Sequence, residues 1–237
     1  LFDDWTHQVV TFSKDGSFLA TIGGGVLQCP RGVAVDREGC IVVADAGNHR
    51  VVVLRRDGSV KQTLGEGALQ RPWGVAAFED GGVVATDRAG HRVHVWRADG
   101  SAECSFGLEG SGVGQLSYPA GVAVDREGCI VVADCGNCRV QVFGRDGSVV
   151  RCFGSRGGGP GELQAPADVA VDGEGRVVVA DRGNHRVVVF DREGRHLRTL
   201  GGLGSEVGRL GCPSGVAVDA SGRIVVADHI HCRLQAL

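Results

Sequence analysis

The stretch DAGNHRVVVLRRDG, residues 45–58, determines the fold because the chain repeats it. Nearly the same string returns as DRAGHRVHVWRADG from Asp87, DCGNCRVQVFGRDG from Asp134 and DRGNHRVVVFDREG from Asp181. Prolines keep the same period, with spacings of 42, 47, 47 and 47 residues between Pro30, Pro72, Pro119, Pro166 and Pro213. Two unrelated markers that share one period indicate a chain built from structural repeats.

Each repeat has the pattern of four short strands. In the first repeat these are GVAVD (32–36), CIVVAD (40–45), NHRVVVL (48–54) and SVKQTLG (59–65). Runs of Val and Ile bounded by Gly and Asp turns favour strands, and no segment has sustained helical periodicity. Four antiparallel strands in about 40–45 residues predict one blade of a β-propeller. We therefore expect an all-β fold.

The number of blades follows from the two ends of the chain. LFDDWTHQVVTF aligns with the second and third strands of a repeat, which places Asp3 on Asp45 and His7 on His49. We expect a single domain over residues 1–237 with six blades, one of them incomplete, and a five-bladed ring is the alternative. The expected units cover residues 1–25 (partial), 26–67, 68–110, 111–157, 158–204 and 205–237.

Composition narrows the class of protein. With 40 Gly and 43% hydrophobic residues among 237, the chain is too apolar for disorder and too rich in Gly for long helices. No apolar run approaches the roughly 18 residues of a membrane span. Nine cysteines scattered over strand positions favour reduced thiols and a cytoplasmic location over a disulfide framework. Because the chain contains no Met, we expect it to be part of a longer protein.

The recurring His and Arg are better explained by structure than by chemistry. His49, His91 and His185 open the third strand of their repeats, and Cys138 takes this position in another repeat. We expect the Arg that follows to pair with the Asp that ends the second strand. Five arginines hold this position: Arg50, Arg92, Arg139, Arg186 and Arg233. Cys135 and Cys138 have zinc-like spacing but no second ligand pair, so we expect neither a metal nor a cofactor.

These motifs resemble a known family. Pro-x-Gly-Val-Ala-Val-Asp, then Gly-x-Ile-Val-Val-Ala-Asp, then Asn-His-Arg-Val is similar to the NHL repeat over essentially the whole chain. The free cysteines make it most similar to the C-terminal propellers of tripartite-motif ubiquitin ligases, and the Arg-rich composition to an antiviral, innate-immune branch of them. This resemblance implies that the propeller binds RNA or proteins, while a separate RING domain carries the ligase chemistry.

Binding residues are expected where the repeats differ. The fourth-to-first and second-to-third connections emerge on one face, because antiparallel strands alternate direction. Arginine beside an exposed aromatic ring suits single-stranded nucleic acid, through phosphate neutralisation and base stacking. Acidic residues such as Glu66 and Glu162 share this face. The candidate binding residues are Arg31, Arg71, Trp73, Arg88, Tyr118, Arg156, Arg182, Arg209, His229 and His231.

Three functions are compatible with these residues. The first is a non-catalytic module of a larger cytoplasmic ubiquitin ligase that recruits RNA or another nucleic acid. The second is a protein-interaction platform that takes ubiquitination substrates or another acidic partner on the same face. The third is a metal-dependent hydrolase or lyase, which needs inward-facing ligands that break the repeat, and Asp168 is the one inward departure from Gly. We expect the chain itself not to be an enzyme, and oligomerisation to use domains outside it.

Overall fold

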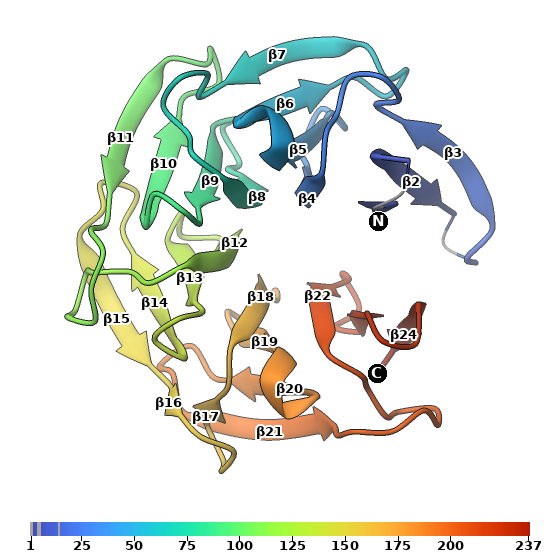
Figure 1. Ribbon diagram of the computed structural model, residues 1–237. Coiled ribbons are helices and arrows are strands. Elements are labelled where there is room, and N and C mark those ends of the chain that lie inside the picture. Colours follow the sequence, from blue (N-terminus) through green and yellow to red (C-terminus); the bar gives the residue numbers. More distant parts are fainter. Residues whose placement is uncertain (1, 4–5, 14) are drawn as a thin grey trace. The chain divides into compact units, whose positions relative to one another are not determined.

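The computed structural model describes residues 2–3, 6–13 and 15–237, which form mainly short strands joined by turns and loops (Figure 1). The chain divides into two compact units, residues 1–105 and residues 106–237. No helix among the described residues is long and apolar enough to cross a membrane.

The first unit holds three antiparallel sheets in which strand order follows the sequence. The N-terminal sheet contains β1 (Phe2–Asp3), β2 (Gln8–Phe12) and β3 (Phe18–Ile22). The next sheet contains β4 (Pro30–Val35), β5 (Ile41–Asp45), β6 (Arg50–Leu54) and β7 (Val60–Leu64), with the short helix η1 (Ala46–Asn48) between β5 and β6. The last contains β8 (Pro72–Ala77), β9 (Val83–Asp87), β10 (Arg92–Trp96) and β11 (Ala102–Phe106), whose final residue opens the second unit.

The second unit repeats this plan. Its first sheet contains β12 (Pro119–Val124), β13 (Ile130–Asp134), β14 (Arg139–Phe143) and β15 (Val149–Phe153). A parallel pair, β16 (Ser155–Arg156) and β17 (Glu162–Leu163), leads to β18 (Pro166–Val171), β19 (Val177–Asp181), η2 (Arg182–Asn184), β20 (Arg186–Phe190) and β21 (His196–Gly201). The last sheet contains β22 (Pro213–Val218), β23 (Ile224–Asp228) and β24 (Arg233–Ala236). The expected all-β fold of four-stranded antiparallel blades is confirmed.

The apolar second strand of a blade faces two cores at once. Val42 and Ala44 of β5 pack into a core shared with the β8–β11 sheet, whereas Ile41 and Val43 pack into a core shared with the N-terminal sheet. Successive side chains of a strand point to opposite faces, so both sets are covered only because a sheet lies on each side. Full burial of one such Val contributes about 1.5–3 kcal/mol. This explains why the VVAD runs lack polar alternation.

A buried carboxylate ties the second and third strands together. The Nε of an Arg lies 2.9, 2.7, 2.7 and 3.0 Å from this carboxylate in four pairs: Asp45–Arg50, Asp134–Arg139, Asp181–Arg186 and Asp228–Arg233. The same carboxylates accept a backbone N–H from the loop that opens the repeat, from Gln28, Ser117, Gln164 and Gly211. The predicted Asp–Arg pairing is confirmed in these four repeats, and we call this arrangement the Asp–Arg brace.

The second repeat departs from the brace, which corrects the prediction for Arg92. Arg92 is exposed, and the described contacts of Asp87 are with the backbone N–H groups of Gln70, Arg71 and Gly90, at 2.8, 2.8 and 3.2 Å. Gly90 stands where the first repeat has Asn48, whose side chain donates to Asp45. Without that side chain, the carboxylate takes backbone donors instead.

The recurring His has a conformational reason. His49, His91 and His185 have φ values of 55°, 54° and 56°, in the left-handed region, and Cys138 has 55°. His is one of the residues enriched in this region, together with Asn and Asp. The His185 ring also contributes a contact, because its Nδ1 accepts the N–H of Cys212 at 3.1 Å. The predicted structural role of this position is therefore supported by geometry.

Candidate functional site

Trp73 lies among three arginine side chains in the first unit. The guanidinium carbons of Arg31, Arg71 and Arg88 are 5.0, 5.8 and 4.6 Å from the centroid of the Trp73 ring. These are distances at which an aromatic face attracts a cation. Arg71 is exposed, while Trp73, Arg31 and Arg88 are partly buried. We call these four residues the Arg/Trp cluster.

A β-bulge sets the position of Trp73. The pairing of β8 with β9 shifts register between Pro72 and Val75, so Trp73 and Gly74 form the irregular segment. The buried hydroxyl of Thr86 accepts the N–H of Gly74, within this bulge, at 2.8 Å. Bulges commonly redirect a side chain beside a functional site. The other repeats have Ala at the position of Thr86, so this hydroxyl belongs to the second repeat alone.

Backbone contacts bring Arg71 and Arg88 together from two connections. The N–H of Arg88 donates to the carbonyl oxygen of Arg71 at 3.0 Å. The N–H of Arg71 donates to Asp87 Oδ1 at 2.8 Å, so the carboxylate that forms the brace elsewhere here anchors the arginine loop. The departure of the second repeat from the brace thus fixes the backbone that carries two of the three arginines.

Arg31 reaches the cluster from the neighbouring sheet, because β4 and β8 lie side by side (Figure 1). Gly32 permits this approach. A Cβ at residue 32 would lie 2.5 Å from the carbonyl oxygen of Trp73, which is too close for any other residue. Arg31 itself lies in the bulge of β4, where pairing with β5 shifts register between Pro30 and Val33.

The cluster concentrates positive charge. Three guanidinium groups lie within 5.8 Å of one ring centroid, and the buried carboxylate of Asp87 lies beneath the same loop. The Trp73 ring attracts each guanidinium, which offsets part of their mutual repulsion. An anion that contacts several of them would relieve the rest.

The six other predicted binding residues lie in the second unit and make separate contacts. Arg156 donates to the carbonyl oxygen of Gly136 at 3.1 Å, and Arg209 Nη1 is 3.5 Å from that of Gly201. Tyr118 is exposed and has a φ of 48°. Arg182 lies exposed in η2, and His229 is also exposed. The described contacts do not join these residues into one group.

His231 has a structural contact rather than a free ring. Its Nδ1 is 2.9 Å from both carboxylate oxygens of Asp228. It stands at the position of Asn48 and Asn184, whose side chains donate to the brace carboxylate of their own repeats. Its geometry therefore favours a place in the Asp–Arg brace, although its residue type differs from the Asn of the other repeats.

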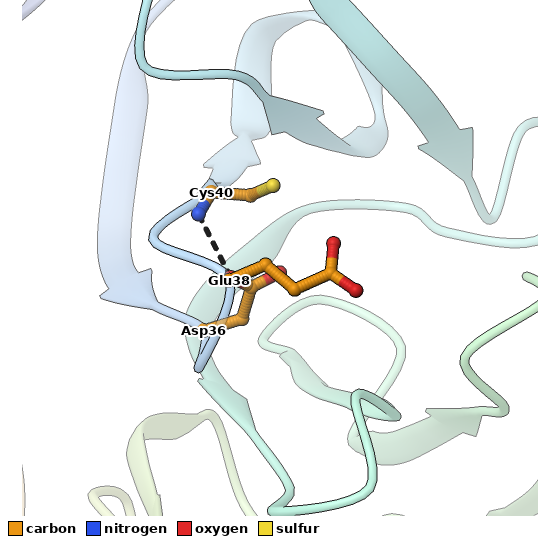
Figure 2. A group of neighbouring side chains, drawn as sticks. All are labelled: Asp36, Glu38 and Cys40. Carbon is orange, nitrogen blue, oxygen red and sulfur yellow. Dashed lines mark hydrogen bonds between the residues drawn. The ribbon is translucent and has the colours of Figure 1, made fainter.

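Two groups of acidic and cysteine side chains resemble metal ligands. Asp36, Glu38 and Cys40 converge in one turn, and Asp125, Glu127 and Cys129 repeat the arrangement (Figure 2). Their contacts are those of a turn, since Asp36 Oδ1 accepts the N–H of Cys40 at 2.8 Å and Glu38 pairs with Lys61 at 2.6 Å. The absence of a metal stays a prediction. All nine cysteines are free, as expected.

Asp168 also departs from the repeat pattern, because the other first strands have Gly at its position. Its Oδ2 accepts the N–H of Val216 at 3.0 Å, so the side chain reaches from β18 to β22. A Cβ at Gly121 of β12 would lie 2.0 Å from Asp168 Oδ1, which places the carboxylate between three first strands. Burial raises the pKa of Asp168 to about 7, against the opposing effect of the backbone donors. This carboxyl group can therefore exchange a proton near neutral pH.

Comparison with known proteins identifies the repeat. The NHL repeat matches residues 27–54, 69–96, 116–143, 163–190 and 210–237. These five matches agree with the five-bladed alternative and correct the first choice of six. The N-terminal sheet of three strands, β1–β3, precedes the first match. None of the curated proteins compared with the chain matches it.

Solved structures of similar fold include enzymes. Virginiamycin B lyase from Staphylococcus aureus has a TM-score of 0.71 at 10% identity, covering 99% of this chain and 78% of that one. A gluconolactonase from Xanthomonas campestris has a TM-score of 0.74 at 20% identity, covering 99% and 80%. A chain of a nidogen/laminin complex has a TM-score of 0.63 at 20% identity, covering 84% and 77%.

At these identities the likeness shows the fold alone. It nevertheless overturns the expectation that the chain is not an enzyme, because the same fold occurs in a lyase and in a gluconolactonase. That expectation rested on the lack of a recognisable set of catalytic residues. A single sequence could not exclude catalysis on that ground, since function resides in sites carried by a fold rather than in the fold itself.

Proposed function

The chain belongs to the NHL-repeat family, and we propose that it is a binding module that takes single-stranded nucleic acid, RNA in particular, at the Arg/Trp cluster. The observation that supports this most directly is the position of Arg31, Arg71 and Arg88 within 5.8 Å of the Trp73 ring centroid. The fold itself agrees with a binding or scaffold role.

The chemistry of the cluster suits a phosphate backbone. Arginine presents a planar fork of donors that matches phosphate oxygens, and each phosphate that it neutralises releases condensed counterions. A strand that binds here also gains stacking on an aromatic or guanidinium plane, which contributes about 1–3 kcal/mol per base. The net charge of the chain is −3, so the attraction is local to the cluster.

The resemblance to tripartite-motif ligases extends the proposal to the parent protein. In that setting the module would hold RNA, or ubiquitination substrates bound with it, near a RING domain in the cytoplasm and take part in antiviral defence. The full-length coding sequence tests this extension. A cysteine and histidine array of RING spacing in it would support the ligase context, and a parent chain without one would contradict it.

Binding of labelled single-stranded RNA tests the cluster. We expect the unsubstituted chain to bind the RNA at low salt. The double variant Arg71→Glu with Arg88→Glu should lose at least about tenfold in affinity, because two carboxylates that repel phosphate replace two guanidinium groups that attract it. The matched control is Arg182→Glu with Arg209→Glu, which reverses two arginines of the second unit. An equal loss in both double variants would point to a general charge effect and contradict the assignment.

An acidic protein partner is the rival occupant of the cluster. Its prediction differs, because RNA would then fail to bind the parent protein even at low salt. An acidic peptide would bind instead and would lose affinity in the Arg71→Glu and Arg88→Glu variant.

Acid–base catalysis at Asp168 is a second candidate function, favoured by a pKa raised to about 7 and by the gluconolactonase of similar fold. A carboxyl group with a pKa near the working pH is suited to transfer protons. Hydrolysis of gluconolactone by the purified chain tests it. The candidate predicts a rate above the uncatalysed reaction that Asp168→Asn abolishes, and it fails if Asp168→Asn is as active as the parent.

A further inference from the structure

The turn between β13 and β14 carries two cysteines three residues apart. Cys135 and Cys138 stand where the first repeat has Ala46 and His49, and no other repeat has Cys at both positions. A Cys-x-x-Cys pair serves either metal binding or thiol–disulfide exchange. The groups of described side chains that converge like metal ligands do not include this pair. Thiol–disulfide exchange is therefore the chemistry that the pair suggests.

The turn brings the two cysteines within the range of a disulfide bond. The N–H of Cys138 donates to the carbonyl oxygen of Cys135 at 3.2 Å, and the end Cα atoms of such a four-residue turn lie within about 7 Å of each other. A disulfide joins residues whose Cα atoms are about 4.4–6.8 Å apart. The Sγ of Cys138 also donates to the carbonyl oxygen of Cys135, at 3.7 Å, so this sulfur already points toward Cys135.

Neighbouring contacts hold the turn in this shape. The N–H of Gly136 donates to the carbonyl oxygen of Ser117 at 2.8 Å. The side chain of Asn137 donates to the carboxylate of Asp134 and to the carbonyl oxygen of Gly110, both at 2.9 Å. Because the backbone between the two cysteines is already fixed, closing a ring here loses little chain entropy.

The two thiols differ in how easily a dissolved reagent reaches them. Cys135 is partly exposed, whereas Cys138 is 1% exposed. Reactive cysteines are typically partly exposed and lie near basic groups. Arg156 meets the second condition, because its Nη2 is 3.1 Å from the carbonyl oxygen of Gly136, the residue after Cys135. Cys135 is therefore placed to react first, and Cys138 to react only through Cys135.

We propose that Cys135 and Cys138 form a redox-active dithiol that reduces low-molecular-weight disulfides. The thiolate of Cys135 attacks one sulfur of the dissolved disulfide, whose S–S bond breaks, and the leaving thiolate takes up a proton. Cys138 then loses its proton and attacks the Cys135 sulfur, which releases the second half of the reagent as a thiol. Two electrons pass from the dithiol to the reagent, and the chain is left with a Cys135–Cys138 bond. This inference is independent of the proposed function.

Mass spectrometry of the reduced chain after exposure to oxidised glutathione tests the inference. Unreacted thiols are alkylated before digestion, and fragmentation of peptide 127–139 locates the bond, since Cys129 lies in the same peptide. We expect Cys135 and Cys138 together to lose two hydrogen atoms while Cys129 is alkylated. Cys138→Ser should instead retain a glutathione adduct at Cys135, because the thiol that releases it is gone. Cys135→Ser should leave Cys138 reduced, because glutathione cannot reach it.

The fifth repeat offers a matched control. The Sγ of Cys232 donates to the carbonyl oxygen of His229 at 3.7 Å, and its φ of 48° is close to the 55° of Cys138. This turn has the same form but only one cysteine, so Cys232 should form a mixed disulfide and no internal bond. His229→Cys supplies the missing thiol and should produce a second internal disulfide. Circular dichroism of each variant checks that the chain is folded.

Several results would overturn the inference. They are a lasting glutathione adduct at Cys135 of the unsubstituted chain with Cys138 alkylated, a bond from Cys135 to Cys129, and no reaction at Cys135. A folded His229→Cys variant that forms no internal bond would also contradict it, since the turn would then not suffice to join the two thiols. None of these results depends on RNA affinity, so the proposed function stands or falls separately.

Discussion

At the scale of single residues, the same Asp position has two uses. In four repeats its buried carboxylate holds an Arg side chain and a loop N–H, which ties three segments of a blade together. In the second repeat Asp87 keeps the loop N–H, from Gln70, but holds the backbone N–H of Arg71 in place of an Arg side chain. The residue that stabilises the scaffold elsewhere thus positions a binding residue here.

The brace predicts a large loss of stability from a small change. Asp181→Asn leaves Arg186, whose side chain is 12% exposed, without its charge partner. It also replaces the oxygen that accepts from the Asn184 side chain with an NH2 group, while the retained oxygen can still accept the N–H of Gln164. We expect the free energy of unfolding in urea to fall by about 3 kcal/mol, as when one partner of a buried ion pair is removed. Arg195→Gln breaks an exposed pair with Asp191 and should change stability by less than about 1 kcal/mol. Similar effects of the two substitutions would contradict the brace.

Thr86 gives a prediction that separates stability from binding. Thr86→Ala installs the residue of the other repeats and removes the hydroxyl that accepts the N–H of Gly74. We expect the free energy of unfolding to fall by about 1 kcal/mol, the usual contribution of one hydrogen bond. RNA affinity should change little, because the same register shift forms in the four repeats that have Ala at this position. A several-fold loss of affinity would contradict this and show that the Trp73 bulge depends on Thr86.

At the scale of elements, the first strand of each blade carries the residues that differ. Each first strand has a register shift after its proline, and Arg31 and Trp73 occupy this bulge in β4 and β8. Asp168 directly follows the shift in β18. The bulge frees one or two side chains from regular pairing, so these positions can vary while the rest of the strand stays fixed.

Asp168 makes the stability of the protein depend on pH. Its folded pKa, about 7, is above the ordinary value of 3.8, so the native state binds more protons between these two values. The contribution of this group to stability therefore decreases as pH rises from about 4 to 7. We expect Asp168→Asn and Asp168→Gly to remove this slope and, at pH 8, to stabilise the protein by about 2 kcal/mol, below the full value of the pKa shift because the side chain is partly exposed.

Urea unfolding at pH 5 and pH 8 provides the measurement. The difference in the free energy of unfolding between the unsubstituted protein and the two Asp168 variants should be larger at pH 8 than at pH 5. A parent protein that is relatively more stable than Asp168→Asn at pH 8 would contradict the raised pKa.

The sequence predicted the elements well and the site in part. The period of the Pro and Asp markers was sufficient for strands, turns and most Asp–Arg pairs, because these features are local and repeated. The partnership of Arg31 with Trp73 was not predicted as a contact, since it depends on how β4 packs against β8 through Gly32. Thr86 was missed as well, although its replacement of a repeated Ala was a visible signal. His231 was predicted to bind a partner. Its actual contact, in which it takes the place of Asn48 or Asn184 beside the brace carboxylate, is visible only in the structure.

At the scale of the whole molecule, five NHL repeats supply a regular scaffold and the second repeat departs from it in several linked residues. Arg71, Trp73 and Thr86 replace the residues of the other repeats. Together with Arg31 and with Arg88, whose position is held by Arg182 in the fourth repeat, they build one cationic cluster. Substitutions that arose independently of one another would be spread over all five repeats. The concentration of these substitutions around the Trp73 ring indicates a shared function, which we infer to be the binding of phosphate groups.

The salt dependence of RNA affinity tests this account most directly. Each phosphate contact on a single strand contributes about −0.7 to the slope of log affinity against log salt concentration. Replacing Arg31, Arg71 and Arg88 with Gln should therefore make the slope shallower by about 2, while Arg156→Gln, Arg182→Gln and Arg209→Gln together should change it much less. Equal slopes for the parent protein and the Arg31, Arg71 and Arg88 variant would contradict the account.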